Sequence, residues 1–241
     1  MKILAVVPAR LASTRLPEKP LIKLNGKEMI RWVYEGTQKS ELIDEVVVAT
    51  DSDKIVNCVE NFGGKALLTS KKHKTGTDRV CEVVEKIGDK YDIIVNVQGD
   101  EPLINGRDLD MLIKPMIENS SIKISTPVKK IEKEEAKNKN TVKVVVDNNN
   151  FALYFSRESI PFISGENIEY YKHIGIYSFR KEFLLKFKGW KQTPLEKAEK
   201  LEQLRVLENG YRIKTVKWNS MLHGVDTEED VRIVERYLKG D

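Results

Sequence analysis

The stretch that decides the fold opens the chain with Ile3-Leu4-Ala5-Val6-Val7-Pro8-Ala9-Arg10. Its apolar run at 3–7 predicts a buried strand, and the proline and small residue after it begin a loop. Similar short runs alternate with longer amphipathic segments through the first half, which is typical of βαβ units around a parallel sheet. We expect strands at residues 3–7, 45–49, 65–68 and 92–97, and helices at residues 27–39, 53–62 and 77–87. The fold class is therefore α/β, with a mostly parallel central sheet flanked by helices.

The second half of the chain follows a different pattern. Strands expected at 122–127, 141–146, 151–154 and 173–179 are separated by turn-rich segments, which favours antiparallel additions over further crossovers. The remaining expected elements are an exposed helix or loop at 129–140, a helix at 195–208, a strand at 212–216 and a last helix from Thr227. We expect one domain, residues 1–241, with a core at about 1–122 and 180–241 and a smaller antiparallel sub-domain at about 123–179.

The composition excludes several classes of protein. The chain has 241 residues, 40% of them hydrophobic, and 41 basic against 37 acidic side chains leave a net charge of +4. A globally disordered chain has few apolar residues and a large net charge, so that class is excluded. A weak overall basic excess is not a charged patch, so we expect no nucleic acid partner. Because no apolar stretch is long enough to span a bilayer, we expect no membrane insertion and a cytoplasmic location.

The loop at residues 8–20 concentrates positive charge directly after the first strand. It contains Arg10, Arg15 and Lys19, although the whole chain has only 11 arginines. Small residues let backbone amides approach an anion, and fixed cations bind the roughly four negative charges of a nucleoside triphosphate. The loop matches neither GxxxxGK[ST] nor GxGxxG, so the common NTPase and dinucleotide interpretations lose their main support. The alternative interpretation is a solvated basic loop.

Two aspartates fit the requirements of a magnesium site. Asp100 follows the apolar strand expected at 92–97, where an ionised carboxylate is costly unless it meets a metal or a cation. Magnesium prefers oxygen ligands, commonly one or two carboxylates together with phosphate oxygens and water. Asp226 is the candidate for the second carboxylate. The competing interpretation of Asp226 is an ordinary cap of the last helix.

Other polar residues have both a functional and a structural interpretation. The segment Thr75-Gly76-Thr77-Asp78-Arg79 either brings an arginine fork to a ligand or is a capped helix start with a surface arginine. Four residues of the second half lie at strand ends or on the polar side of a helix: Arg157, His173, Glu202 and Gln203. Together they are suited to a cleft that binds hydroxyl groups, although each alone also fits a solvated polar position.

Seven motifs in chain order resemble those of the CMP-Kdo synthetase family, the 3-deoxy-manno-octulosonate cytidylyltransferases. They are Val7-Pro8-Ala9-Arg10 through Lys19, Gly76-Thr77-Asp78-Arg79, Asn96-Val97-Gln98-Gly99-Asp100-Glu101-Pro102, Tyr154-Phe155-Ser156-Arg157 with Ile160-Pro161, His173-Ile174-Gly175-Ile176-Tyr177, Leu201-Glu202-Gln203-Leu204-Arg205 and Gly224-Val225-Asp226-Thr227. The resemblance extends from Met1 to about Leu238, and the ordered set is far more specific than any one motif.

The resemblance implies a glycosyltransferase-A-like α/β fold and a cytoplasmic homodimer that uses Mg²⁺. The family joins CTP and Kdo to give CMP-Kdo and pyrophosphate for lipopolysaccharide biosynthesis. The implied nucleotide-binding residues are Ala9, Arg10, Ser13, Arg15, Lys19, Arg79 and Gln98. The implied magnesium ligands are Asp100 and Asp226, which with Arg15 and Lys19 form the catalytic set. The implied sugar-binding residues are Arg157, His173, Tyr177, Glu202 and Gln203.

The family reaction needs no protein nucleophile, since the anomeric hydroxyl of Kdo attacks the α-phosphorus of CTP in line. The chain indeed offers no motif that pairs a Ser or Cys with an adjacent base. Three features depart from the family pattern: Glu158-Ser159, a short connection at 162–170, and His223 in place of a frequent proline. The first two adjoin the implied sugar site, so an 8-amino Kdo analogue or a sialic acid is an alternative substrate. More distant alternatives are a nucleotide-sugar glycosyltransferase and a silent nucleotide-binding module, the latter disfavoured by retention of both aspartates.

Overall fold

The computed structural model describes residues 1–12, 16–164 and 169–239. The chain divides into two compact units, Met1–Asp110 with Ser220–Asp241, and Met111–Asn219. The boundary falls inside helix α4 (Gly106–Glu118). The first unit is therefore made from the beginning and the end of the chain, and the second unit from its middle.

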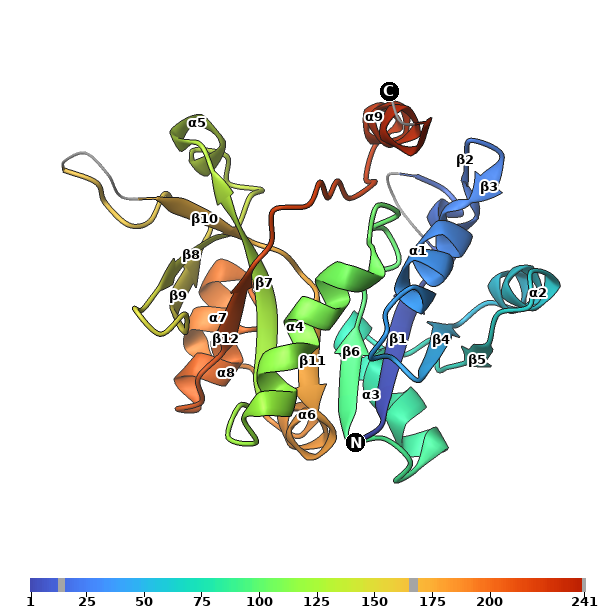
Figure 1. Cartoon of the computed structure of the whole chain (residues 1–241), viewed down its shortest axis with the longest axis horizontal. Helices are drawn as coiled ribbons and strands as arrows, with labels where there is room; N and C mark the ends of the chain where they lie inside the picture. The colour runs from blue at the N-terminus through green and yellow to red at the C-terminus, as the bar shows by residue number, and fades with distance from the viewer. Residues whose placement is uncertain (13–15, 165–168, 240–241) are drawn as a thin grey trace. The chain divides into compact units, whose positions relative to one another are not determined.

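The first unit is built on a parallel sheet in the order β5–β4–β1–β6 (Figure 1). Its strands are β1 (Ile3–Ala9), β4 (Glu45–Thr50), β5 (Ala66–Leu68) and β6 (Ile93–Asn96). The register places Val6 of β1 opposite Val47 of β4 on one side and Asn96 of β6 on the other. Because β1 has a neighbour on each side, residues 4–7 are completely buried, as a continuous apolar run predicts. The parallel arrangement predicted from the sequence is confirmed.

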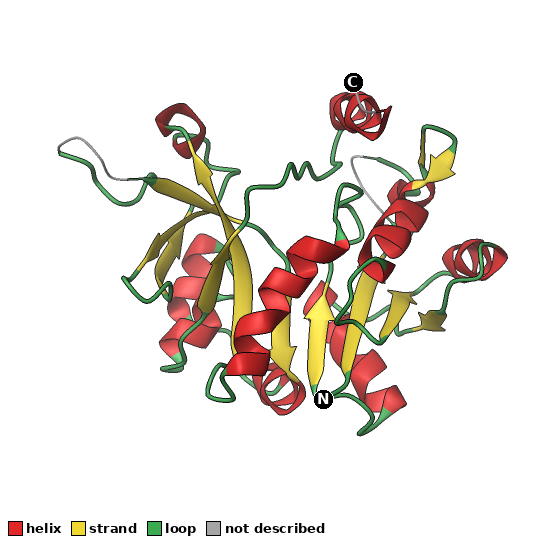
Figure 2. Ribbon diagram, viewed as in Figure 1, coloured by secondary structure: helices red, strands yellow, loops and turns green. Residues whose placement is uncertain are grey.

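Helices connect these strands, as Figure 2 shows by colour. They are α1 (Met29–Gln38), α2 (Asp53–Asn61) and α3 (Gly76–Ile87). A short 3-10 helix, η1 (Lys19–Leu21), and a hairpin of β2 (Lys23–Leu24) and β3 (Lys27–Glu28) lie between β1 and α1. The hairpin explains why α1 begins two residues later than the sequence predicts.

The last helix, α9 (Glu228–Lys239), packs onto the hairpin that follows β1 (Figure 1). Its Val234 joins a buried cluster with Leu24, Met29 and Val225. The backbone N–H of Asn25 also donates to Glu235 at 2.9 Å. Apolar burial therefore brings the segment just before α9, which carries Asp226, onto the beginning of the chain.

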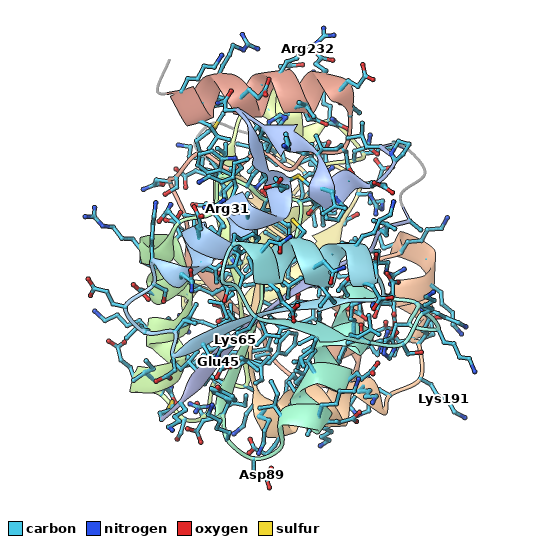
Figure 3. The ribbon with its side chains drawn as sticks, turned by 90° about the vertical axis from the view of Figure 1, so that its right-hand side faces the viewer. Arg31, Glu45, Lys65, Asp89, Lys191 and Arg232 are labelled. Carbon is cyan, nitrogen blue, oxygen red and sulfur yellow. The ribbon has the colours of Figure 1, made fainter. Side chains whose placement is uncertain are left out.

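Charges at the start of β4 are paired with one another. Glu45 accepts hydrogen bonds from Lys65 at 2.9 Å and Lys90 at 3.0 Å, and from the hydroxyl of Tyr91. Figure 3 shows Glu45 and Lys65 side by side. The Tyr91 hydrogen bond, together with those from the two lysines, lowers the pKa of Glu45 to about 2 against the opposing effect of burial. The negative charge of Glu45 at the start of β4 is thus balanced by Lys65 and Lys90.

The second unit is largely antiparallel. Its strands follow the order β11–β7–β10–β8–β9, and β12 pairs with β7 in parallel. They are β7 (Ile124–Ile131), β8 (Lys143–Val146), β9 (Ala152–Ser156), β10 (Tyr170–His173), β11 (Tyr177–Arg180) and β12 (Lys214–Lys217). Its helices are α5 (Lys133–Ala136), α6 (Lys181–Lys188), α7 (Pro194–Glu199) and α8 (Leu204–Glu208). The predicted antiparallel additions are confirmed.

Two predicted elements of the second unit are each divided in two. The strand expected at 173–179 breaks into β10 and β11, because a tight turn joins the N–H of Ile176 to the carbonyl of Ile174 at 2.8 Å. The helix expected at 195–208 becomes α7 and α8, because Lys200 adopts a left-handed conformation with φ of 55°. In addition, β7 continues to Ile131, into the segment expected to be exposed helix or loop.

Two α-helices of the described residues have no counterpart among the predicted elements, α4 and α6. In α4, four buried residues, Leu109, Leu112, Ile113 and Met116, follow helical spacing. The sequence analysis did not predict this helix because Pro115 lies inside it, and proline ordinarily ends a helix. Among the residues that the structure describes, no helix has the length and apolar character needed to cross a membrane.

Candidate active site

A pocket of about 410 Å³ lies beyond the carboxyl ends of β1 and β6 in the first unit. Ligands of open parallel sheets bind at this edge. Six residues predicted for the site line it together: Ala9, Arg10, Lys19, Gln98, Asp100 and Asp226. Pro8, Ala12, Pro20, Met29 and Gly99 complete the lining. Ser13 and Arg15, also predicted for this site, fall outside the described residues.

Lys19 lies between the two predicted metal ligands. Its Nζ is 2.6 Å from Oδ2 of Asp100 and 2.8 Å from Oδ1 of Asp226. Burial by itself would lower the pKa of Lys19, but the charge and hydrogen bond of Asp100, followed by those of Asp226, outweigh it and raise that pKa. Lys19 is therefore a permanent cation at neutral pH, and one positive charge is shared by two carboxylates.

Backbone contacts hold the loops that carry these charges. The N–H of Val225 donates to the carbonyl of Asp100 at 2.9 Å, which joins the two aspartate-bearing segments directly. A Cβ on Gly99 would lie 2.8 Å from the carbonyl oxygen of Pro8, closer than real side chains approach. Glycine is therefore required for the loops after β1 and β6 to pack at this distance. This contact was missed by the sequence analysis, although Gly99 was quoted there within a motif.

The donor set of the pocket fits magnesium. Asp100 and Asp226 each place a carboxylate oxygen within hydrogen-bond distance of one cationic atom, so both can face one ion. Across the described ranges, no group of three or more His, Cys, Asp or Glu residues is arranged to hold a metal. Magnesium does not need such a group, because it commonly takes one or two carboxylates and completes its shell with phosphate oxygens and water.

Arg79 lies inside the protein, so the alternative of a surface arginine is wrong. The residue is 0% exposed, and its guanidinium donates to Asp51 at 2.8 Å and to Thr69 at 2.5 Å. The capping part of that alternative is confirmed, because Thr75 and Asp78 form a capping box at the start of α3. The predicted contact of Arg79 with the nucleotide stays a prediction.

Arg79 is connected to the carboxyl-terminal edge of the sheet by its ion pair with Asp51. That aspartate follows β4 and lines a second hollow of about 690 Å³, beside residues of the basic loop. The Nε of Arg79 is buried and has no hydrogen-bond partner among the described residues. The guanidinium thus joins the ends of β4 and β5 to α3, and its geometry is that of a buried structural ion pair.

Replacing Arg79 by Met should destabilise the protein strongly. The variant leaves Asp51 without its cation, and breaking a buried ion pair costs about 3–5 kcal/mol. Urea unfolding measures this loss, with Arg31→Met as a control, because Arg31 forms a more exposed pair with Glu35 at 2.7 Å. Full stability of Arg79→Met, combined with loss of CTP binding, would instead show that Arg79 serves the ligand alone.

The second unit gathers four of the predicted sugar-site residues. The His173 ring lies 5.4 Å from the Tyr177 ring, and its Nδ1 lies 3.5 Å from the Nε2 of Gln203. Burial raises the pKa of Tyr177 well above its usual value, with an added contribution from the charge of Glu202. The segment that carries Glu202 and Gln203 is fixed by a buried pair, in which Arg205 donates to both carboxylate oxygens of Glu196 at 2.7 and 2.5 Å.

Arg157 is held mainly by backbone groups of the same unit. Its Nε donates to the carbonyl of Glu199 at 3.0 Å and its Nη1 to the carbonyl of Lys139 at 3.2 Å. Its own carbonyl accepts from the buried Nζ of Lys143 at 2.5 Å. Within the described residues these contacts use two of the five guanidinium N–H donors, so others are available to a ligand.

Thr126 is a member of this cluster that the sequence analysis missed. Its hydroxyl oxygen lies 3.0 Å from Nε2 of His173, and also 3.1 and 2.9 Å from the carbonyls of Ile174 and Ile176. The hydroxyl has one proton, which goes to a carbonyl, so the oxygen accepts from His173. Because the Gln203 amide donates to Nδ1, His173 is a neutral ring with its proton on Nε2. No sequence motif marks Thr126, which comes from a different strand.

His173 should therefore show the Nε2–H tautomer near neutral pH in ¹⁵N-resolved NMR spectra. Burial lowers its pKa to about 3, whereas an unfolded histidine titrates near its usual 6.5. The unfolded chain thus binds more protons between these values, and the free energy of unfolding falls as the pH drops from about 6.5 toward 3. Thr126→Val should weaken the tautomer preference. A protonated ring, or an Nδ1–H tautomer at pH 6, would contradict the assignment.

The geometry of the first unit is suited to a phosphorylated nucleotide, because cations and carboxylates meet beyond the ends of parallel strands. The family model described as cytidylyltransferase matches residues 4–214. A 3-deoxy-manno-octulosonate cytidylyltransferase of Fusobacterium nucleatum subsp. nucleatum is 50% identical over 241 residues, which cover 99% of this chain and 98% of that protein. The 3-deoxy-manno-octulosonate cytidylyltransferase of Syntrophotalea carbinolica is 46% identical over 253 residues, and the match covers 100% of each chain.

A solved structure gives the same result. It is a CMP:2-keto-3-deoxy-manno-octonic acid synthetase complexed with CTP, 40% identical, with a TM-score of 0.96 over 100% of this chain and 99% of that chain. The chain belongs to the cytidylyltransferase family. The resemblance that the seven motifs indicated is thereby confirmed.

Proposed function

We propose that the protein joins CTP and Kdo to give CMP-Kdo and pyrophosphate. The observation that carries the proposal is the convergence of Asp100 and Asp226 on Lys19 in a pocket next to Arg10. The relatives described above are named for this activity, and the chain matches nearly their whole length. The proposed place of the reaction is lipopolysaccharide biosynthesis.

The proposed reaction forms one bond and breaks one. The oxygen of the anomeric hydroxyl attacks the α-phosphorus, the bond from that phosphorus to the bridging oxygen of the β-phosphate breaks, and pyrophosphate leaves with the bond's electron pair. The hydroxyl proton passes to solvent. Charge develops on the leaving pyrophosphate, and we propose that Lys19 and Arg10, which line the pocket, stabilise it. Arg15 is proposed for the same task.

Asp100 and Asp226 are the residues that would hold Mg²⁺. When bound, this ion supplies Lewis-acid stabilisation of the phosphate charge and helps to orient the reactants. Lys19, which pairs with both carboxylates here, would be the cation nearest to a phosphate group bound beside them. Ala9 and Gln98 line the same pocket and are proposed, with Ser13, to contact the nucleotide.

The second unit supplies the proposed sugar contacts. Neutral His173, the hydroxyl of Tyr177 and the amide of Gln203 offer donors and acceptors to sugar hydroxyls, and Glu202 adds an acceptor. Arg157 is proposed to bind the sugar carboxylate, since a guanidinium matches a carboxylate in charge and shape.

A homodimer in the cytoplasm is also proposed for this chain. The dimer is supported by large apolar side chains that face solvent in the second unit, Phe162 at 88% and Leu153 at 59% exposure. Side chains of this kind are a common part of protein interfaces.

Pyrophosphate release tests the proposed function. Purified protein with CTP and Mg²⁺ should release pyrophosphate when Kdo is added, and less with an 8-amino Kdo analogue or a sialic acid. Lys19→Ala should remain folded but lose on the order of 10²–10³ in turnover, because it removes a charge-stabilising group. Lys23→Ala is the matched control, since Lys23 is exposed on β2. Near-normal turnover of Lys19→Ala, or no release with any of the sugars, would contradict the proposal.

A further inference from the structure

Asp230 binds the backbone that carries Asp226. Its Oδ2 accepts from the N–H of Asp226 at 3.0 Å and from the N–H and hydroxyl of Thr227, both at 2.8 Å. In return, the N–H of Asp230 donates to the Thr227 hydroxyl oxygen at 3.2 Å. Thr227 and Asp230 thus form a capping box at the start of α9, and the box also holds the backbone N–H of the candidate metal ligand Asp226.

The other carboxylate oxygen of Asp230 is used as well. Oδ1 lies 2.6 Å from Nε2 of His223, on the far side of the same loop. The Asp230 carboxylate therefore contacts both ends of the segment 223–227, His223 at one end and Thr227 at the other. Burial would raise the pKa of Asp230, but the hydrogen bonds of His223, Thr227 and the Asp226 backbone lower it overall, so the group stays ionised at neutral pH.

The residues between these two contacts are fixed on their other side. Val225 is 0% exposed and packs in the cluster with Val234, while its N–H donates to the carbonyl of Asp100. A Cβ on Gly224 would lie 3.2 Å from Oε1 of Glu101, a tight approach. The loop is thus held between the Asp100 segment and the Asp230 carboxylate, and the direction of the Asp226 side chain depends on both.

We propose that Asp230 is a positioning residue that aligns Asp226 with Asp100 for binding of a divalent cation. The inference rests on the proposed function, because it takes Asp226 to be a metal ligand. Side chains that orient metal ligands typically change metal affinity by 10–100-fold when they are replaced. Asp230→Ala should therefore weaken cation binding by about 10-fold or more.

The chemistry of asparagine predicts an intermediate effect. Asp230→Asn keeps one acceptor oxygen for the N–H groups of Asp226 and Thr227, and its amide can donate to a neutral His223. It loses only the charge. The expected order of affinity is wild type, then Asp230→Asn, then Asp230→Ala. Asp230→Asn also keeps the test decisive if Asp230→Ala fails to fold.

The experiment measures Mn²⁺ binding by electron paramagnetic resonance, with CTP present and no sugar. Mn²⁺ is used as a probe with magnesium-like oxygen preferences, and pyrophosphate release at varied Mg²⁺ is recorded in parallel. Two controls separate positioning from general structure. Glu229→Gln removes an exposed charge from the same turn of α9, and Asp78→Asn removes the equivalent carboxylate from the capping box of α3. Both should bind Mn²⁺ as the wild type does.

Asp226→Asn serves as the reference for loss of a ligand. If Asp226→Asn and Asp230→Ala both weaken Mn²⁺ binding and the controls do not, the inference is supported. If Asp226→Asn weakens binding and Asp230→Ala does not, or if Asp78→Asn weakens it equally, the inference is overturned while the proposed function stands. If Asp226→Asn binds Mn²⁺ normally, the proposed metal site and this inference both fail.

Discussion

The geometry of the candidate site depends on one electrostatic constraint, the placement of two carboxylates close to each other on a single ammonium group. Asp100 and Asp226 repel each other when both are ionised, and a cation between them offsets that repulsion. Lys19 provides that cation, at 2.6 and 2.8 Å. The three residues come from the loop after β1, the loop after β6 and the segment before α9, so their meeting requires the parallel sheet and the packing of the last helix onto the first hairpin. The fold therefore brings two carboxylates and one ammonium group from three distant segments to one place.

Much of this arrangement could be predicted from the sequence, because it follows from periodicity and from position along strands. The apolar run at 3–7 and the similar runs after it predict a parallel sheet, and parallel strands put their carboxyl ends at one edge. Arg10, Lys19 and Asp100 lie in the connections that follow such strands, which is why residue type and position were enough to point to this edge. Asp226 was ambiguous between a ligand and a helix cap. The structure shows that the cap is made by Thr227 and Asp230, which leaves the Asp226 side chain to Lys19.

Other features could not be predicted because they depend on contacts between segments that are distant in the sequence. The burial of Arg79 is caused by Asp51 and Thr69, neither of which a motif connects to it. Thr126 reaches His173 from another strand, 47 residues away in the sequence. Helix α4 was missed because Pro115 is tolerated within it, where its buried residues supply the stability that proline removes. In each case tertiary packing overrides the local signal.

A crystal structure of the wild-type protein with CTP and Mg²⁺ would show directly what Asp100, Asp226 and Lys19 bind. We expect a metal ion that contacts both Asp100 and Asp226, with the Lys19 ammonium moved from the carboxylates to phosphate oxygens of CTP. Two results would contradict it: a metal bound without either aspartate, or a Lys19 that still bridges both carboxylates while metal and CTP are bound.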